Sequence, residues 1–103
     1  MSKFHHRGGV RIGLFNASWP LATLDIDESR ILVRVLRREY DFQRDSIRAL
    51  NRYSGLLSNG VQIQHFLPEV DKLFIFWTFS PGRVYENITA CGYDLEAGPP
   101  TSL

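Results

Sequence analysis

Residues 72–95 read KLFIFWTFSPGRVYENITACGYDL, and this stretch decides the fold. The part from 72 to 79 holds six apolar residues among eight, and four of these are aromatic. A run this apolar must be buried on most of its surface, which predicts a strand inside a core. The rest of the chain is therefore expected to form a sheet that wraps around this strand.

A short helix is expected directly after the strand. Ser80 suits the N-cap, Pro81 suits the first helical position, and Gly92 suits the C-terminal stop. One face of this helix is apolar, so we expect that face to pack against the core and to cover one open end of the curved sheet. The apolar positions at helical spacing are Val84, Ile88 and Cys91.

The bulk composition indicates one ordinary globular domain. The chain has 103 residues, 44% of them hydrophobic, and a net charge of +1, so no global field draws it to nucleic acid or membrane. Its single cysteine excludes an intrachain disulfide, and no apolar stretch is long enough to span a membrane. We expect a cytoplasmic protein without a cofactor; the inner face of the membrane is a second location.

The domain is predicted to cover residues 10–95. Residues 1–9, with adjacent histidines and adjacent glycines, have no periodicity and are predicted to be a flexible tail. Residues 96–103, rich in glycine and proline, are predicted to be a second flexible tail.

Short alternating segments precede the apolar strand. They predict strands near residues 10–14, 22–26, 30–36, 40–42 and 61–65, with turns at 15–20 and 27–29 between the first three. Residues 44–53 remain open. Arg44, Arg48 and Arg52 at intervals of four would line one side of a helix, whereas the alternation of Ile47 and its neighbours also fits a strand.

Taken together, the segments predict a mainly β fold of the α+β type, a small antiparallel barrel of six or seven strands with one C-terminal capping helix. The stretches WPLATLDIDESRILVRVL, EYDFQRDSI, GVQIQHF and LFIFWTFSPGRV resemble the bacterial pleckstrin-homology-like (PH-like) domains. The resemblance covers about residues 10–95. It implies that residues 47–53 form a strand and that the open end of the barrel can take phosphoinositide headgroups or peptides.

Basic and aromatic residues are expected at that open end. If every second turn falls at one end of the barrel, the turns at 15–19, 37–38 and 67–71 meet there. They would bring Arg37, Arg38 and Lys72 close to Trp19. Arginine and lysine suit phosphate, and an exposed tryptophan suits a membrane interface. The alternative is a charged rim in contact with solvent.

A patch for a partner protein is the other candidate surface. Leu32 and Leu36 are on the outer phase of the third strand, and Leu56 and Leu57 lie in a glycine-rich connection. If they are exposed together, they suit self-association or a partner protein. If the helix or a loop covers them, they belong to the core.

No sequence motif points to catalysis or to a metal. The histidines, His5, His6 and His65, form no metal-binding spacing, and His65 is expected to be hydrogen-bonded at a strand end. Cys91 is expected to be a buried structural thiol. A nucleic-acid surface made of Arg44, Arg48 and Arg52 is a weaker reading, because acids interleave with these arginines.

The sequence therefore favours a non-catalytic PH-like interaction module that binds a protein partner or an acidic membrane headgroup. The alternative is a structural domain that self-associates into a homo-oligomer and has no small ligand. A third hypothesis, an enzyme or small-molecule binder, would have to use His65 or the interior of the barrel.

Overall fold

The computed structural model describes residues 3–55 and 58–98. Within them, seven β-strands, one 3-10 helix and one α-helix follow one another. Their bounds are β1 Lys3–Ile12, β2 Phe15–Asp27, β3 Arg30–Val35, β4 Arg38–Gln43, η1 Arg44–Ser46, β5 Ile47–Ser54, β6 Asn59–His65, β7 Phe74–Thr78 and α1 Pro81–Ala90.

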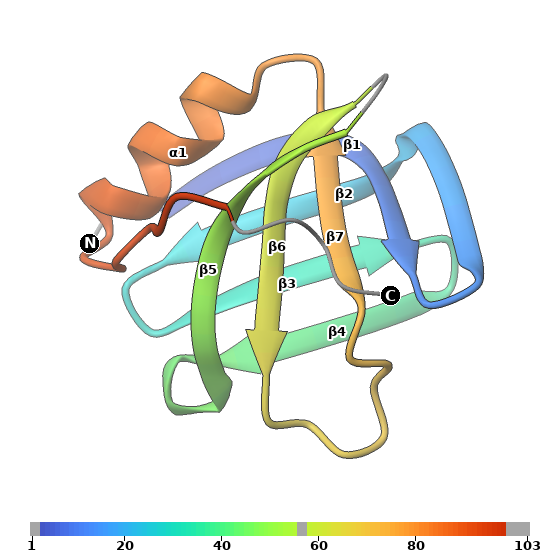
Figure 1. Ribbon diagram of the computed structural model, residues 1–103, viewed down its shortest axis with the longest axis horizontal. Coiled ribbons are helices and arrows are strands. Elements are labelled where there is room, and N and C mark those ends of the chain that lie inside the picture. The colour runs from blue at the N-terminus through green and yellow to red at the C-terminus, as the bar shows by residue number, and fades with distance from the viewer. Residues whose placement is uncertain (1–2, 56–57, 99–103) are drawn as a thin grey trace.

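The strands form one curled antiparallel sheet in the order β4-β3-β2-β1-β7-β6-β5. Figure 1 shows β5, β6 and β7 crossing in front of β2, β3 and β4, with α1 over one open side of the curl. β1 joins the two halves, because it pairs with β2 and, through residues 9–12, with β7. The predicted mainly β fold with one capping helix is confirmed.

The core lies between the two halves of the curled sheet. Strands that alternate apolar and polar residues send every second side chain inward. Full burial of a large apolar side chain stabilises the fold by about 1.5–3 kcal/mol. The largest side chains of this core are fully buried: Phe42, Phe74, Phe76, Leu24, Ile26, Ile31, Leu50, Ile63 and Ile88.

α1 closes the core as the sequence predicts. Pro81 lies in its first turn, and Gly92, with a φ of +86°, follows its last turn. Ser80 occupies the N-cap position, but its side chain makes no capping hydrogen bond. The predicted inward face is confirmed, since the side chains on it are buried: Val84, Ile88 and Cys91.

Arg44 links the C-terminal end of α1 to the β2–β3 turn through hydrogen bonds to main-chain carbonyls. Its guanidinium donates to the carbonyl of Glu28 at 2.7 Å, to that of Cys91 at 3.2 Å and to that of Gly92. It also lies over the ring of Tyr93, 4.2 Å from the centroid. Burial raises the pKa of Tyr93 to about 12, so its hydroxyl remains a donor to a main-chain carbonyl 2.8 Å away.

The prediction of a flexible tail over residues 1–9 is wrong for the part that the structure describes. β1 begins at Lys3 and pairs with β2 from there. Gly8 and Gly9 lie where β1 meets β7: a Cβ at Gly8 would overlap the carbonyl oxygen of Trp77, and one at Gly9 would overlap its indole. A pair of glycines that suggests a linker is therefore needed for close approach of two strands.

The first turn also differs from the prediction. The chain reverses at Gly13 and Leu14, not at residues 15–20; Gly13 has a φ of +58°, and its N–H bonds to the carbonyl of Leu73 at 3.0 Å. β2 accommodates Pro20 because β3 pairs with β2 only from Ala22 onward.

For residues 44–53, the strand alternative is correct after a short 3-10 turn. β5 pairs with β6, and Leu50 points into the core. The predicted C-terminal tail is wrong at its start, because Glu96 donates its N–H to the carbonyl of Leu50 at 2.8 Å and accepts from Arg52 at 2.9 Å. This contact covers the outer edge of β5. Residues 99–103 lie outside the described part.

Candidate functional site

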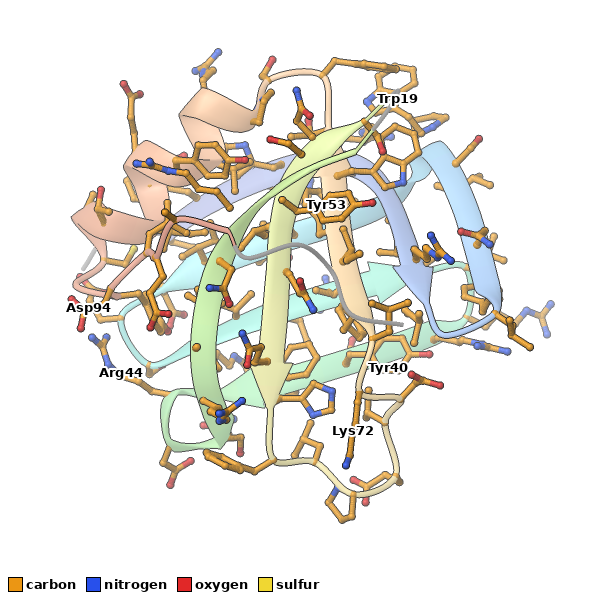
Figure 2. The ribbon with its side chains drawn as sticks, viewed as in Figure 1. Trp19, Tyr40, Arg44, Tyr53, Lys72 and Asp94 are labelled. Atoms are coloured by element: carbon orange, nitrogen blue, oxygen red, sulfur yellow. The ribbon has the colours of Figure 1, made fainter. Side chains whose placement is uncertain are left out.

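A groove with a volume of about 500 Å³ lies beneath the loop of residues 66–73, which joins β6 to β7. We call it the β6–β7 groove. Figure 2 shows Lys72 on this loop, at the opposite end of the molecule from Trp19. One wall of the groove is the outer side of β5 and β6, and the other is the loop itself. The loop contributes apolar side chains, namely Phe66, Leu67, Pro68, Val70 and Leu73.

The polar lining of the groove is cationic and amide-bearing. Arg48 and Lys72 line it together with Gln62 and Gln64, and no carboxylate is among its described lining residues. Asp71 is in the same loop but is not part of the described lining. Its carboxylate accepts the main-chain N–H of Leu73 and lies against Gly13 in the β1–β2 turn. Both charged side chains of the described lining are therefore cations, while the same loop also carries Glu69 and Asp71 outside that lining.

A chain of hydrogen bonds holds Arg48 in place. Its guanidinium donates to Oε1 of Gln64 at 2.6 Å, and Nε2 of Gln64 donates to the side-chain carbonyl of Asn51. Asn51 is 2% exposed, and its amide nitrogen is 3.4 Å from a carboxylate oxygen of Glu96. The amide of Gln64 is held from its other end by Asn51, so its Oε1 is presented to Arg48.

His65 lines the same groove, but both of its ring nitrogens are used. Nε2 donates to the carbonyl of Asp71 at 2.9 Å, and Nδ1 accepts the N–H of Leu67 at 3.1 Å. The ring also packs against Phe42 and Phe74. The expectation of a hydrogen-bonded histidine at a strand end is confirmed. His65 shapes the loop and has no nitrogen lone pair left for a substrate.

The structure separates the residues predicted for the open end. Lys72 reaches the β6–β7 groove, whereas Arg37 and Arg38 lie at the β3–β4 turn, outside its lining. Arg38 lies over the ring of Phe15, 4.1 Å from the centroid, and its guanidinium is 3.5 Å from the hydroxyl of Tyr40. Arg38 thus lies over one aromatic ring, that of Phe15, and donates to the hydroxyl of Tyr40.

Trp19 lies at the opposite end of β7 from Lys72. Its ring centroid is 5.6 Å from that of Phe79, which follows the last residue of β7, whereas Lys72 precedes the first residue of β7. Sequence reasoning misplaced Trp19 because it placed the first turn at residues 15–19. In the structure these residues belong to β2 and run back along β1.

The predicted leucine patch is not assembled in the described residues. Leu32 is 5% exposed, among the long side chains of Lys3, Arg30 and Arg34. Leu36 is exposed at the β3–β4 turn with a φ of +56°. Leu56 and Leu57 lie outside the described residues, and of the two leucines that the structure describes, Leu36 alone is exposed.

The three arginines do not form one surface: Arg44 and Arg48 both line a second pocket beside Tyr93 and Glu96, and Arg52 is not among its described lining residues. Arg44 is bound to carbonyls near the end of α1, Arg48 is in the β6–β7 groove, and Arg52 lies over the ring of Tyr85, 5.4 Å from the centroid. A bulge between Ile47 and Ala49 turns Arg48 away from the phase of its neighbours. Sequence alternation gives no signal for this bulge.

The N-terminal histidines lie on β1 and point to different partners. Nδ1 of His5 is 2.6 Å from a carboxylate oxygen of Asp25, and Nε2 of His6 donates to the side-chain oxygen of Asn87 at 2.7 Å. Among the described residues, no group of three or more histidine, cysteine, aspartate or glutamate side chains is placed to hold a metal ion.

His6 should make the stability of the protein depend on pH. Desolvation lowers its pKa below the ordinary value of 6.5, and the hydrogen bond with Asn87 offsets this only in part. The unfolded chain therefore takes up the proton more readily, so the free energy of unfolding falls as the pH drops through 6.5. Below the pKa of the folded state the loss stops.

Thermal unfolding of the wild type and of His6→Gln, from about pH 8 to about pH 5, checks this. We expect a smaller loss of Tm on acidification in the variant. An equal loss in both proteins would assign the pH dependence to other groups.

Comparisons with known families, curated proteins and solved structures find no match. In the part of the chain that the structure describes, no helix has the length and apolar character needed to cross a membrane.

Proposed function

We propose that this protein is a non-catalytic interaction module of the PH-like kind, which binds an acidic peptide segment of a partner protein. The observation that carries the proposal is the β6–β7 groove, where Arg48 and Lys72 line a cavity of about 500 Å³ whose described lining has no carboxylate. A positive, partly apolar groove selects a ligand that combines negative charge with apolar surface.

The mixture of side chains favours a peptide over a headgroup. A phosphate is best held by several cations that converge on one point. Here Arg37 and Arg38 lie outside the groove lining. One N–H group of the Arg48 guanidinium already donates a hydrogen bond to Gln64. Gln62 offers an amide that matches a peptide bond. The apolar loop side chains suit aliphatic residues between the acids of a peptide.

The order of elements supports the PH-like assignment. Seven antiparallel strands curl into a half-barrel and a single helix follows them, as the resemblance implies. The bonded ring nitrogens of His65 favour a binding role over general-base chemistry at the groove. Cys91 is buried and its thiol pKa is raised, chiefly by desolvation, which disfavours a nucleophilic role.

A fluorescence anisotropy titration tests the proposal. The probe is a short labelled peptide in which glutamate alternates with leucine. We expect Arg48→Ala and Lys72→Ala each to weaken its binding by about tenfold, the effect of losing a charge-assisted hydrogen bond. Arg83→Ala removes the same charge from the exposed surface of α1 and should leave the affinity unchanged.

Three results would overturn the proposal. The first is equal binding of a peptide with glutamine in place of glutamate. The second is a loss of affinity with Arg37→Ala but not with Arg48→Ala, which would move the site to the β3–β4 turn. The third is binding to phosphatidylserine vesicles without binding to the peptide, which would indicate a headgroup ligand.

A further inference from the structure

His65, the last residue of β6, holds the loop of residues 66–73 at two points. Near the start of the loop, Nδ1 of the ring accepts the main-chain N–H of Leu67 at 3.1 Å. Near its end, Nε2 is 2.9 Å from the main-chain oxygen of Asp71. One side chain therefore connects both parts of the loop that forms a wall of the β6–β7 groove.

These two bonds fix the protonation state of the ring. A main-chain carbonyl accepts and never donates, so Nε2 carries a proton; a main-chain N–H donates and never accepts, so Nδ1 carries none. His65 is thus held as the neutral tautomer with its proton on Nε2. A second proton can enter only at Nδ1, where it would face the N–H of Leu67, donor against donor. The charged ring is therefore incompatible with the closed loop.

Apolar side chains surround the ring on the side of the strands. β4 and β7 place Phe42 and Phe74 with their ring centroids 5.2 and 6.3 Å from that of His65, and β5 places Ile47 opposite it. Tyr40 of β4 packs on Phe74, with its hydroxyl 3.5 Å from a guanidinium nitrogen of Arg38. The strands therefore hold the imidazole in place without bonding to its nitrogens.

The charged groups of the neighbouring elements do not neutralise a second proton. They are Asp41, Asp45, Arg48, Glu69, Asp71 and Lys72. The two cations line the groove together with His65. The carboxylate of Asp71 accepts the N–H of Leu73, and that of Asp41 pairs with Arg30. Within residues 3–55 and 58–98, no carboxylate is bonded to the ring. While the loop is closed, a second proton would gain neither an acceptor nor a counter-ion.

We propose that His65 is a pH-sensitive switch, whose protonation releases the loop of residues 66–73 and opens the β6–β7 groove. Histidine is the side chain that ordinarily changes its charge between about pH 5 and about pH 8. In the released loop, Nδ1 can donate to water. The charged ring therefore favours the open loop and the neutral ring favours the closed loop, and the change reverses when the proton leaves.

Release of the loop removes one wall of the groove. The loop supplies Lys72 and the apolar lining side chains between Phe66 and Leu73. The consequence for a ligand rests on the proposed function. We expect the affinity for the acidic peptide to fall about tenfold between about pH 7.5 and about pH 5, although the ring gains a positive charge, because the contacts of this wall are lost. The release itself needs no ligand.

Nuclear magnetic resonance tests the switch in the protein without ligand. The ring nitrogen signals of His65 report protonation, and the main-chain amide signal of Leu67 reports the bond to Nδ1. We expect both to change along the same pH curve. His65→Gln keeps a donor and an acceptor but takes up no proton, so its Leu67 signal should stay constant over the same range. His65→Phe keeps a ring but has neither bond, so its loop should be released at every pH.

His5→Gln is the matched control. His5 lies on β1 with its side chain 55% exposed and has no contact with the loop, so this variant should keep the response of the wild type. A Leu67 amide signal that stays constant while the ring of His65 takes up its proton would overturn the switch, as would an equal change in His65→Gln.

The peptide titration, repeated at both pH values, separates the switch from the proposed function. If the Leu67 signal changes but the peptide binds equally at both pH values, the groove proposal stands and its regulation by His65 is wrong. If the signal changes and the peptide binds at neither pH, the switch stands and the peptide proposal is wrong. A loss of affinity on acidification in the wild type but not in His65→Gln supports both.

Discussion

Replacement of Phe74 by alanine should lower the free energy of unfolding by about 3–5 kcal/mol. Phe74 is fully buried at the start of β7. Its ring centroid lies 4.8 Å from that of Phe42 and 5.1 Å from that of Tyr40, both on β4. The ring therefore connects the two halves of the curled sheet, and its removal leaves a cavity that both halves would have to collapse around.

Because small domains have a total stability of about 5–15 kcal/mol, this loss should be visible as a large shift in the denaturant midpoint. Phe66→Ala removes the same side chain from an exposed position and should change the stability by less than about 0.5 kcal/mol. Urea unfolding followed by circular dichroism compares the two. Similar midpoints for both variants would show that Phe74 does not connect the halves as described.

Gly8→Ala should destabilise the fold by about 3 kcal/mol, at the upper end for overpacking. The added Cβ would overlap the carbonyl oxygen of Trp77 and would lie 2.8 Å from Cζ of Phe76. A main-chain oxygen cannot move aside as a flexible side chain can. β1 and β7 would therefore have to separate, at the contact that joins the two halves of the sheet.

Gly82→Ala is the opposite case and serves as the control. Gly82 lies in the first turn of α1, and a Cβ there would meet nothing within 4 Å. Alanine is the better helix former, so this variant should gain up to about 1 kcal/mol. Thermal unfolding of the two variants should thus shift Tm in opposite directions. A Gly8→Ala protein as stable as the wild type would contradict the close contact between β1 and β7.

The candidate site was less predictable than the fold. Lys72 could be assigned to an end loop because it precedes an obvious strand. Arg48, Gln62 and Gln64 could not be brought together, since the bulge in β5 that turns Arg48 toward Gln64 has no marker in local alternation. Trp19 was placed at the wrong end because a proline usually signals a turn, whereas Pro20 lies in a stretch of β2 that β3 does not pair.

Local pattern alone determined the apolar strand, the capping helix and its buried face, because burial is recorded in the spacing of apolar residues. The same pattern could not reveal that Gly8 and Gly9 belong to a strand, since glycine serves both flexible linkers and close packing. That choice depends on Trp77, about seventy residues away in the chain, whose main chain and indole leave no space for a Cβ. Only the tertiary structure brings such distant groups together, and it alone decided where the β6–β7 groove lies.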